Sequence, residues 1–292
     1  MTFRTRFAPS PTGPLHLGHA FSALTAAQLA AENDGTFLLR IEDIDQSRAR
    51  SEWEAQIYDD LAWLGLSWPE PVMRQSDRLE VYGDALRQLW ESGVLFACTC
   101  TRRDIAEATS APQEGGGALI GPDGVVYPGT CYDKGNLAGD APFPTDTALR
   151  LRIAEAVART AQNGMFWFEE TGTGPEGQTG KITFTAESVI HDIGDVVLAR
   201  RDMGTSYHLS VVLDDAAQGI THVVRGADLF EATKIHVVLQ RLLGLPTPIY
   251  HHHRLIRDET GKRLAKRHDA EALSLYRKQG KSADNITSIL EV

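Results

Sequence analysis

The chain is short of cysteine and has no long apolar run. Its three cysteines, Cys98, Cys100 and Cys131, are too few, and odd in number, for a framework of disulfides. No stretch approaches the roughly 18 uncharged apolar residues of a membrane helix. The first residues, MTFRTRFAPS, lack the apolar core of a signal peptide. We therefore expect a cytoplasmic protein.

Acidic residues outnumber basic ones, and the P-loop motif of many nucleotide-binding proteins is missing. The formal net charge is −10, which argues against a broad basic face for nucleic acid but allows a local basic patch. The chain contains no G-x-x-x-x-G-K-[ST] sequence, so it is not a P-loop NTPase. Its 42% apolar and 23% charged content is that of a globular enzyme.

The most informative stretch is 7–19, FAPSPTGPLHLGH, which lies between the short segment 2–7 and the apolar-periodic stretch 20–31. This order predicts a strand, a stiff proline-rich turn and a helix start. His16 and His19 stand three residues apart and share one face of the helix mouth. Unpaired N–H groups there favour phosphate binding. The alternative is a proline-rich turn with two surface histidines.

A βαβ unit follows from the next elements. The helix 20–33 ends at an Asn-Asp-Gly stop signal, and 36–41, TFLLRI, has the pattern of a buried strand. Such a unit implies a parallel sheet, whose ligands bind at the carboxyl ends of strands. Both the histidine turn and Glu42 fall at such ends. The sequence Glu42–Asp45 is otherwise a solvated acidic turn.

The three cysteines form a second candidate site. Cys98 and Cys100 are one residue apart and Cys131 follows a glycine-rich loop, which together supply three soft ligands for tetrahedral zinc. From the residues alone, the fourth ligand is open between histidine and water, and the absence of any metal is also open. The cluster is far from the histidine turn in sequence, so a metal there would be structural.

The remaining pattern predicts further elements. Three consecutive histidines in the segment 249–253 cannot all bind one ion, because neighbours on a strand face opposite ways; we interpret them as structural. The expected helices are 51–64, 76–91 and 228–243; the expected strands are 147–158, 165–170, 196–200, 220–225 and 249–253; and 110–125 is expected to be a loop without regular structure.

Three stretches resemble class I aminoacyl-tRNA synthetases of the glutamyl and glutaminyl branch. RFAPSPTGPLHLGH resembles their HIGH signature, and 206–215, SYHLSVVLDD, resembles the run that returns the chain from an insertion to the nucleotide-binding fold. GKRLAKR at 261–267 resembles the KMSKS loop, although Arg263 and Ala265 depart from it and the serine hydroxyl is lost. Without the other motifs, this basic run is a solvated loop or a nucleic-acid patch.

The resemblance implies a fold and domain order. The expected fold is α/β, a Rossmann-type parallel-sheet catalytic domain with an inserted zinc-bearing acceptor-type subdomain. Only 25 residues follow Arg267, so no anticodon-binding domain is expected. The implied segments are 1–95, first half of the catalytic domain; 96–190, insertion; 191–245, second half; and 246–292, the KMSKS-like loop with a short helical end.

The resemblance also implies the site residues. Those for glutamate are Arg6, Ala8, Ser10, Glu42, Tyr207 and Arg225, of which Glu42 pairs with the substrate ammonium and the arginines with carboxylates. Those for ATP are Pro11, Thr12, Gly13, His16, Gly18, His19 and Lys266, with His16, His19 and Lys266 catalytic. Tyr127 fills the fourth zinc position beside Cys98, Cys100 and Cys131. An arginine before a glycine turn, such as Arg225, is otherwise a surface residue.

The implied activity has two steps. Glutamate and ATP, with Mg²⁺, form glutamyl-adenylate and pyrophosphate, and glutamate is then transferred to a tRNA. A relative without an anticodon-binding domain implies transfer to the queuosine base of tRNA(Asp), by a monomer. Two alternatives stay open, a minimal synthetase that charges a tRNA 3′ end and a non-catalytic paralogue that binds glutamate or adenylate.

Overall fold

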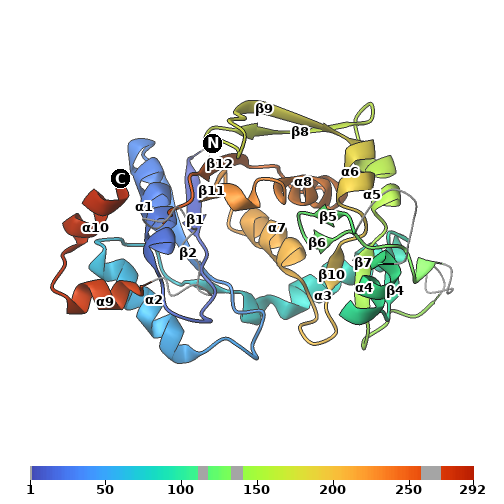
Figure 1. Cartoon of the computed structure of the whole chain (residues 1–292), viewed down its shortest axis with the longest axis horizontal. Helices are drawn as coiled ribbons and strands as arrows, with labels where there is room; N and C mark the ends of the chain where they lie inside the picture. The colour runs from blue at the N-terminus through green and yellow to red at the C-terminus, as the bar shows by residue number, and fades with distance from the viewer. Residues whose placement is uncertain (1, 111–117, 133–140, 258–270) are drawn as a thin grey trace.

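The structure is a computed structural model that describes residues 2–110, 118–132, 141–257 and 271–292 (Figure 1). The predicted catalytic Lys266 and the two departures from the KMSKS pattern, Arg263 and Ala265, lie outside these residues. None of the described helices is long and apolar enough to span a bilayer.

The main layer is built from two sheets that meet edge to edge. One holds the parallel strands β1 (Arg4–Phe7), β2 (Thr36–Ile41) and β3 (Met73–Arg74). The other holds β11 (His222–Gly226), β12 (Ile249–His253) and β8 (Met165–Glu170), all parallel, with β9 (Gly180–Thr185) antiparallel at its edge.

Strands β1 and β11 join these two sheets. The Thr221 N–H donates to the Arg4 carbonyl over 2.9 Å, and the two strands lie side by side in Figure 1. From this pair the strand order runs outward in both directions, β1–β2–β3 one way and β11–β12 the other. In open α/β sheets, such a switch point opens a crevice at the carboxyl ends of the strands.

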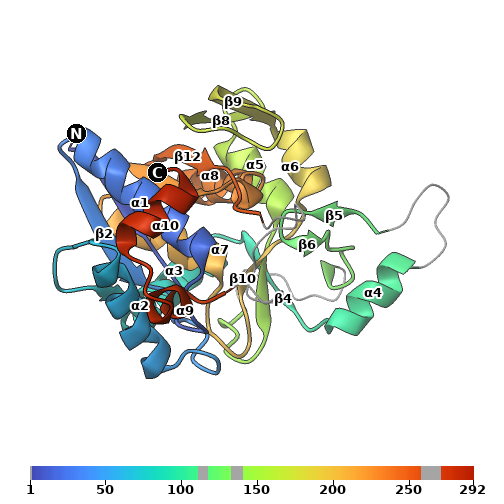
Figure 2. The same cartoon turned by 60° about the vertical axis from the view of Figure 1, so that its left-hand side comes forward.

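Helices cover this layer because their apolar residues recur at helical spacing. In α1 (Leu17–Glu32) the small side chains Ala20, Ala23, Ala26 and Ala30 are buried, which brings the helix close to the sheet. The terminal α10 (Ala283–Leu290) packs across α1 (Figure 2). The other helices around the main layer are α2 (Ser51–Trp63), η1 (Gln75–Arg78), α3 (Leu79–Glu91), α7 (Tyr207–Ala217), η3 (Ala227–Leu229), α8 (Thr233–Leu242) and α9 (Leu273–Lys278).

A smaller antiparallel sheet stands at the other end of the molecule (Figure 1). Its strands are β4 (Leu95–Cys98), β7 (Ala148–Leu151) and β10 (Val197–Ala199). Beside it lie α4 (Arg102–Ser110), the hairpin β5 (Ile120–Gly121) and β6 (Gly124–Val125), α5 (Ile153–Thr160) and α6 (Ala186–Asp192). This end carries the three cysteines.

The structure confirms the predicted strands 36–41, 165–170 and 249–253. The single strand expected over 147–158 is wrong, because β7 ends at Leu151 and α5 begins at Ile153. At this point the apolar residues stop recurring at every second position, as in a strand, and recur every three or four positions, as in a helix. Ile153, Ala156 and Val157 face the core.

Two other expectations also need correction. The helix expected over 228–243 is divided into η3 and α8, and the loop expected over 110–125 contains the hairpin β5–β6. Strand β8 pairs with β12 in the sheet that also holds β11, so part of the predicted insertion shares a sheet with strands from the predicted segments 191–245 and 246–292. The domain boundaries themselves stay a prediction.

Candidate active site

A cavity of about 370 Å³ opens at the carboxyl ends of β1 and β11. It lies at the switch point of the sheet, where a ligand is expected. Eight of the predicted site residues line it: Arg6, Ala8, His16, Gly18, His19, Glu42, Tyr207 and Arg225. The wall also includes residues 253–256, at and just after the end of β12. Segments more than 200 positions apart in the chain thus contribute to one site.

The two histidines form the start of α1. The Gly18 N–H donates to His16 Nδ1 over 3.1 Å, and the His16 N–H donates to His19 Nδ1 over 3.1 Å. Because each Nδ1 accepts, the proton of each neutral ring is on Nε2, which is the donor nitrogen. A Cβ on Gly18 would lie 3.0 Å from His16 Cε1, so glycine suits this close approach. The centroids of the two rings lie 3.8 Å apart, and the ring planes are tilted by 36°.

The proline-rich turn before these histidines is tied to the backbone after β2. The Glu42 N–H donates to the Pro9 carbonyl and the Arg50 N–H to the Pro11 carbonyl, each over 3.0 Å. This positions Glu42 beside the turn. The predicted contact residues Ser10, Pro11, Thr12 and Gly13 are not among those that line the cavity. Their contacts with ligand stay a prediction.

Arg6 is one half of a buried ion pair. Its Nε and Nη2 donate to the two carboxylate oxygens of Asp215 over 2.9 and 3.2 Å. Arg40, fully buried on β2, donates to Asp215 over 2.7 Å and to Glu42 over 3.0 Å. Asp215 and Arg40 thus connect the predicted site residues Arg6 and Glu42.

Burial and charge act in opposite senses on the carboxylates of this network. Burial raises the pKa of Glu42 above its ordinary value, in spite of the lowering effect of Arg40 and Arg6. Burial also acts to raise the pKa of Asp215, but Arg6 and Arg40 together lower it below its ordinary value. Asp215 is therefore the carboxylate that neutralises the arginines.

Sequence reasoning missed Arg40 and Asp215 as parts of the site. A charged residue inside the apolar strand TFLLRI was the available signal for Arg40. Asp215 belongs to the acidic pair that ends SYHLSVVLDD. The neighbouring Asp214 accepts from Arg78 over 2.7 Å and from Tyr82 over 2.9 Å, which ties α3 to α7.

Arg225, at the end of β11, is buried but, unlike Arg6, forms no ion pair with a described residue. Its Nε donates to His252 Nε2 and its Nη1 to His236 Nδ1, both over 3.1 Å. Its Nη2 donates to the Thr233 hydroxyl over 2.6 Å and to the Leu229 carbonyl over 3.2 Å. Among the described residues, no carboxylate oxygen lies within 4.0 Å of its guanidinium. Its charge is held by neutral acceptors and faces the cavity.

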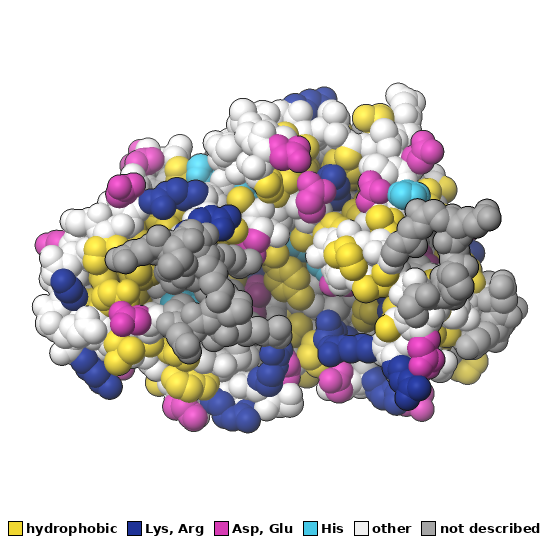
Figure 3. All heavy atoms as spheres, in the orientation of Figure 1, with side chains coloured by type: hydrophobic (Ala, Val, Ile, Leu, Met, Phe, Trp, Pro, Cys, Tyr) yellow, Lys and Arg dark blue, Asp and Glu magenta, His cyan; other side chains and the backbone are white. Residues whose placement is uncertain are grey.

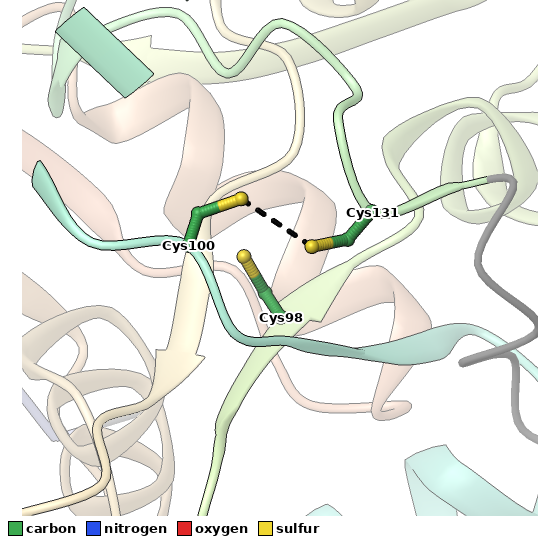
Figure 4. A group of neighbouring side chains, drawn as sticks. All are labelled: Cys98, Cys100 and Cys131. Atoms are coloured by element: carbon green, nitrogen blue, oxygen red, sulfur yellow. Dashed lines mark hydrogen bonds between the residues drawn. The ribbon is translucent and has the colours of Figure 1, made fainter. Parts of the chain in front are cut away.

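The three cysteines converge at the far end of the smaller sheet (Figure 4). Their sulfur atoms all lie within 4.8 Å of one another, and those of Cys100 and Cys131 are 3.3 Å apart. The Tyr127 hydroxyl lies 3.5 Å from the sulfurs of both Cys98 and Cys100. Tetrahedral zinc with sulfur ligands at about 2.3 Å needs a cluster of this size. The donor set therefore fits a zinc ion.

The surroundings of Cys131 favour its thiolate, whereas burial raises the pKa of Cys100. Burial acts to raise the pKa of Cys131, but hydrogen bonds from Tyr127 and the Thr99 backbone lower it to about 6. Arg150 donates to Cys98 Sγ over 3.4 Å, and its guanidinium lies 4.1 Å from the centre of the Tyr127 ring. Burial and the neighbouring thiols raise the pKa of Tyr127, which keeps its proton in the absence of a metal ion.

The molecular surface agrees with the net charge. Over the described part of the face shown in Figure 3, basic and acidic side chains are interspersed. The two arginines of the site, Arg6 and Arg225, are buried and line the cavity. The fold and cavity together define a ligand site of an open parallel α/β sheet, with a histidine-bearing helix N-terminus for an anion beside two arginines and a carboxylate.

Comparison with known proteins identifies the family. The model of class I tRNA synthetases (E and Q), catalytic domain, matches residues 2–117 and 173–291. The glutamyl-Q tRNA(Asp) synthetase of Rhodobacter capsulatus is 61% identical over 98% of this chain and 99% of that protein. The protein of the same name from Cupriavidus metallidurans is 41% identical over 93% of this chain and 79% of that protein. The chain belongs to the class I tRNA synthetase family for glutamate and glutamine.

A solved structure agrees with this assignment. A glutamate tRNA ligase from Elizabethkingia meningosepticum, in complex with its amino acid, superposes with a TM-score of 0.68 and 26% identity, over 91% of this chain. This chain spans 52% of that ligase. The predicted family and the parallel α/β catalytic fold are confirmed.

Proposed function

We propose that this chain is an AMP-forming ligase that activates L-glutamate with ATP and transfers it to the queuosine base of tRNA(Asp). The observation that carries the proposal is the cavity in which Arg225, without a carboxylate partner among the described residues, and Glu42 stand together. The name of the relative that is 61% identical over nearly its full length supports the acceptor.

The charges of the cavity suit glutamate. Glu42 offers a carboxylate to the substrate ammonium, and Arg225 offers a guanidinium to the side-chain carboxylate. Arg6 is already neutralised by Asp215, so it binds and orients without adding a full positive charge. Because every hydrogen bond of Arg225 within the described residues goes to a neutral acceptor, the site favours an anionic side chain over the amide of glutamine.

The first chemical step is an attack of the glutamate α-carboxylate on the α-phosphorus of ATP. Pyrophosphate leaves with the bond electrons, and glutamyl-adenylate is formed. His16 and His19 donate from Nε2 to the phosphates at the helix N-terminus, and Lys266 neutralises the charge that develops on the leaving group. Mg²⁺ bound with ATP supplies further charge neutralisation.

The second step transfers the glutamyl group. A hydroxyl of the queuosine cyclopentenediol attacks the carbonyl carbon of the adenylate and gives its proton to the phosphate of the leaving AMP. The bond between that carbon and the phosphate oxygen breaks, and AMP leaves. The protein holds both reactants in position, and no side chain becomes covalently bound. ATP and tRNA as substrates imply a cytoplasmic site of action; the monomeric state stays a prediction.

The cysteine cluster is proposed to hold one structural zinc ion. Cys98, Cys100, Cys131 and Tyr127 supply four donors, and the ion would tie the end of β4 to the segment around Cys131. Metal analysis of purified protein is expected to give about one zinc per chain. Cys98→Ser should lose it, and unchanged content in that variant would refute the site.

Pyrophosphate exchange tests the activation step. Exchange of labelled pyrophosphate into ATP is expected to require glutamate and to proceed without tRNA. Absence of exchange would favour the non-catalytic alternative. Exchange that appears only with tRNA(Glu) would instead favour the minimal glutamyl-tRNA synthetase, an alternative that the similarity to the solved glutamate tRNA ligase keeps open.

A transfer assay tests the acceptor. The protein is incubated with ¹⁴C-glutamate, ATP and tRNA(Asp) that either carries or lacks queuosine. Label is expected only on the queuosine-containing tRNA(Asp). Label on both forms, or on tRNA(Glu) alone, would overturn the proposed acceptor.

A further inference from the structure

Two histidines hold Arg225, and each is backed by a carboxylate. On one side, His252 accepts from Arg225 Nε at its Nε2 and contacts Glu170 Oε2 through its Nδ1 over 2.5 Å. The Nε2 accepts, so the ring proton is on Nδ1 and is donated to Glu170. Glu170 also accepts the backbone N–H of His252 over 2.9 Å, which fixes the carboxylate.

On the other side, the connection runs through two histidines. His236 Nδ1 accepts from Arg225 Nη1, and His236 Nε2 lies 3.1 Å from His208 Nδ1. His208 Nε2 in turn lies 3.2 Å from Asp123 Oδ1, in the turn of the hairpin β5–β6. The hairpin stands beside α7 and α8 (Figure 1). One tautomer of each ring satisfies the whole series, with every donor pointing from Arg225 towards Asp123.

Burial keeps the rings of His236 and His252 neutral. Burial lowers the pKa of His236 well below its ordinary value, and the adjacent Arg225 lowers it further. Burial also lowers the pKa of His252, although Glu170 opposes the shift. A protonated imidazole at either position would lose its acceptor nitrogen and place a second cation against the guanidinium. Neutral rings therefore orient Arg225 without cancelling its charge.

The two carboxylates come from a part of the chain outside the family pattern. Asp123 and Glu170 both fall between the two stretches that the family model matches, 2–117 and 173–291. The histidines and Arg225 fall inside the second stretch. The series thus links the segment 118–172 to the amino-acid pocket.

We propose that His236 and His252 are positioning residues for glutamate, which hold Arg225 as neutral acceptors and are themselves fixed by Asp123, through His208, and by Glu170. The inference rests on the proposed function, in which Arg225 binds the glutamate side chain. It assigns amino-acid affinity to residues that do not line the cavity. Losing one acceptor should weaken glutamate binding and leave the chemical step unchanged.

Two substitutions of one histidine test the acceptor. His236→Leu removes a hydrogen bond to the charged guanidinium of Arg225, so we expect it to raise KM for glutamate by about tenfold or more. The values of kcat and of KM for ATP should stay within about twofold of wild type. His236→Asn, whose amide oxygen takes the place of Nδ1, should restore KM to within about threefold of wild type. Equal KM values in wild type and His236→Leu, or a loss confined to kcat, would overturn the proposal.

A variant at the protein surface tests Asp123, at the end of the series that starts at Arg225. This test does not depend on whether His236→Leu folds. Asp123 is 39% exposed, so Asp123→Asn should keep the fold and raise KM for glutamate by about threefold. The matched control is Glu187→Gln on the exposed face of α6, which should leave KM unchanged. An unchanged KM in Asp123→Asn would refute the role of this carboxylate. If wild-type protein shows no glutamate-dependent exchange at all, the proposed function itself fails.

Discussion

Arg6 and Arg225 line the same cavity and are equally buried, yet their surroundings differ in charge. Arg6 faces the carboxylate of Asp215, which also neutralises Arg40. Arg225 faces two imidazoles, a hydroxyl and a carbonyl. A buried charge needs compensation. For Arg6 the protein supplies it, whereas for Arg225 we propose that the substrate does. The charge of Arg6 is therefore compensated within the fold, and that of Arg225 is the one we propose for recognition of the substrate.

Removal of the shared carboxylate should have the largest effect, on stability. Asp215→Asn leaves Arg6 and Arg40 without a full counter-charge, and we expect a loss of about 3–5 kcal/mol in the free energy of unfolding. Chemical denaturation measures it. Asp84→Asn, which breaks an exposed pair with Arg87, is the control and should cost about 0.5 kcal/mol or less.

The same variant should change how stability depends on pH. The folded-state pKa of Asp215 is lowered, so its contribution is present above the unfolded value of about 3.9 and is lost as pH falls through the folded value. The Asp215→Asn variant should not show this loss of stability at acid pH. If both proteins lose stability equally on acidification, Asp215 is not the neutralising group.

Substitution of the second arginine should affect activity more than stability. Lysine keeps the charge of Arg225 but cannot reproduce its four hydrogen bonds. Arg225→Lys should lower kcat/KM for glutamate by about 100-fold, as for a buried charged contact. Steady-state pyrophosphate exchange measures it. Normal kcat/KM together with a large loss of stability would reverse the roles assigned to the two arginines.

Acid pH should weaken substrate binding before it unfolds the protein. Burial raises the pKa of Glu42, and only its charged form attracts the substrate ammonium. We expect kcat/KM for glutamate to fall as pH decreases through a value above the ordinary range for glutamate, while Asp215 is still ionised. Exchange rates from pH 8 to pH 5, with unfolding curves at each pH, test this order. Activity that falls only together with stability would contradict it.

The smallest effect is expected at Tyr207, whose side chain lines the cavity together with Arg225 and Arg6. Its ring lies edge-on to His236, with centroids 5.6 Å apart. Tyr207→Phe keeps this packing and removes one donor, so KM for glutamate should rise by about threefold with stability nearly unchanged. Exchange kinetics and thermal unfolding measure the two quantities. A KM effect as large as that of Arg225→Lys would show that the hydroxyl, and not the guanidinium, dominates recognition.

The sequence by itself predicted the βαβ start, the strand TFLLRI and the histidine-bearing helix mouth, because spacing, proline and stop signals act within a few residues. It also predicted the cysteine cluster and, through resemblance, eight residues that line one cavity. These are local patterns or motifs. The change from strand to helix after Leu151 was missed because the apolar residues of β7 and those of α5 follow one another without a break in the sequence.

Only the tertiary structure decided which charges are compensated. Arg6 and Asp215 are separated by 209 positions, and Glu170 and His252 by 82. No local pattern relates such residues. The histidines of 249–253 looked merely structural in sequence, yet the pleat of β12 turns His252 towards Arg225. The two arginines are visible in the sequence, but only burial and long-range contacts pair Arg6 with a carboxylate and Arg225 with neutral acceptors.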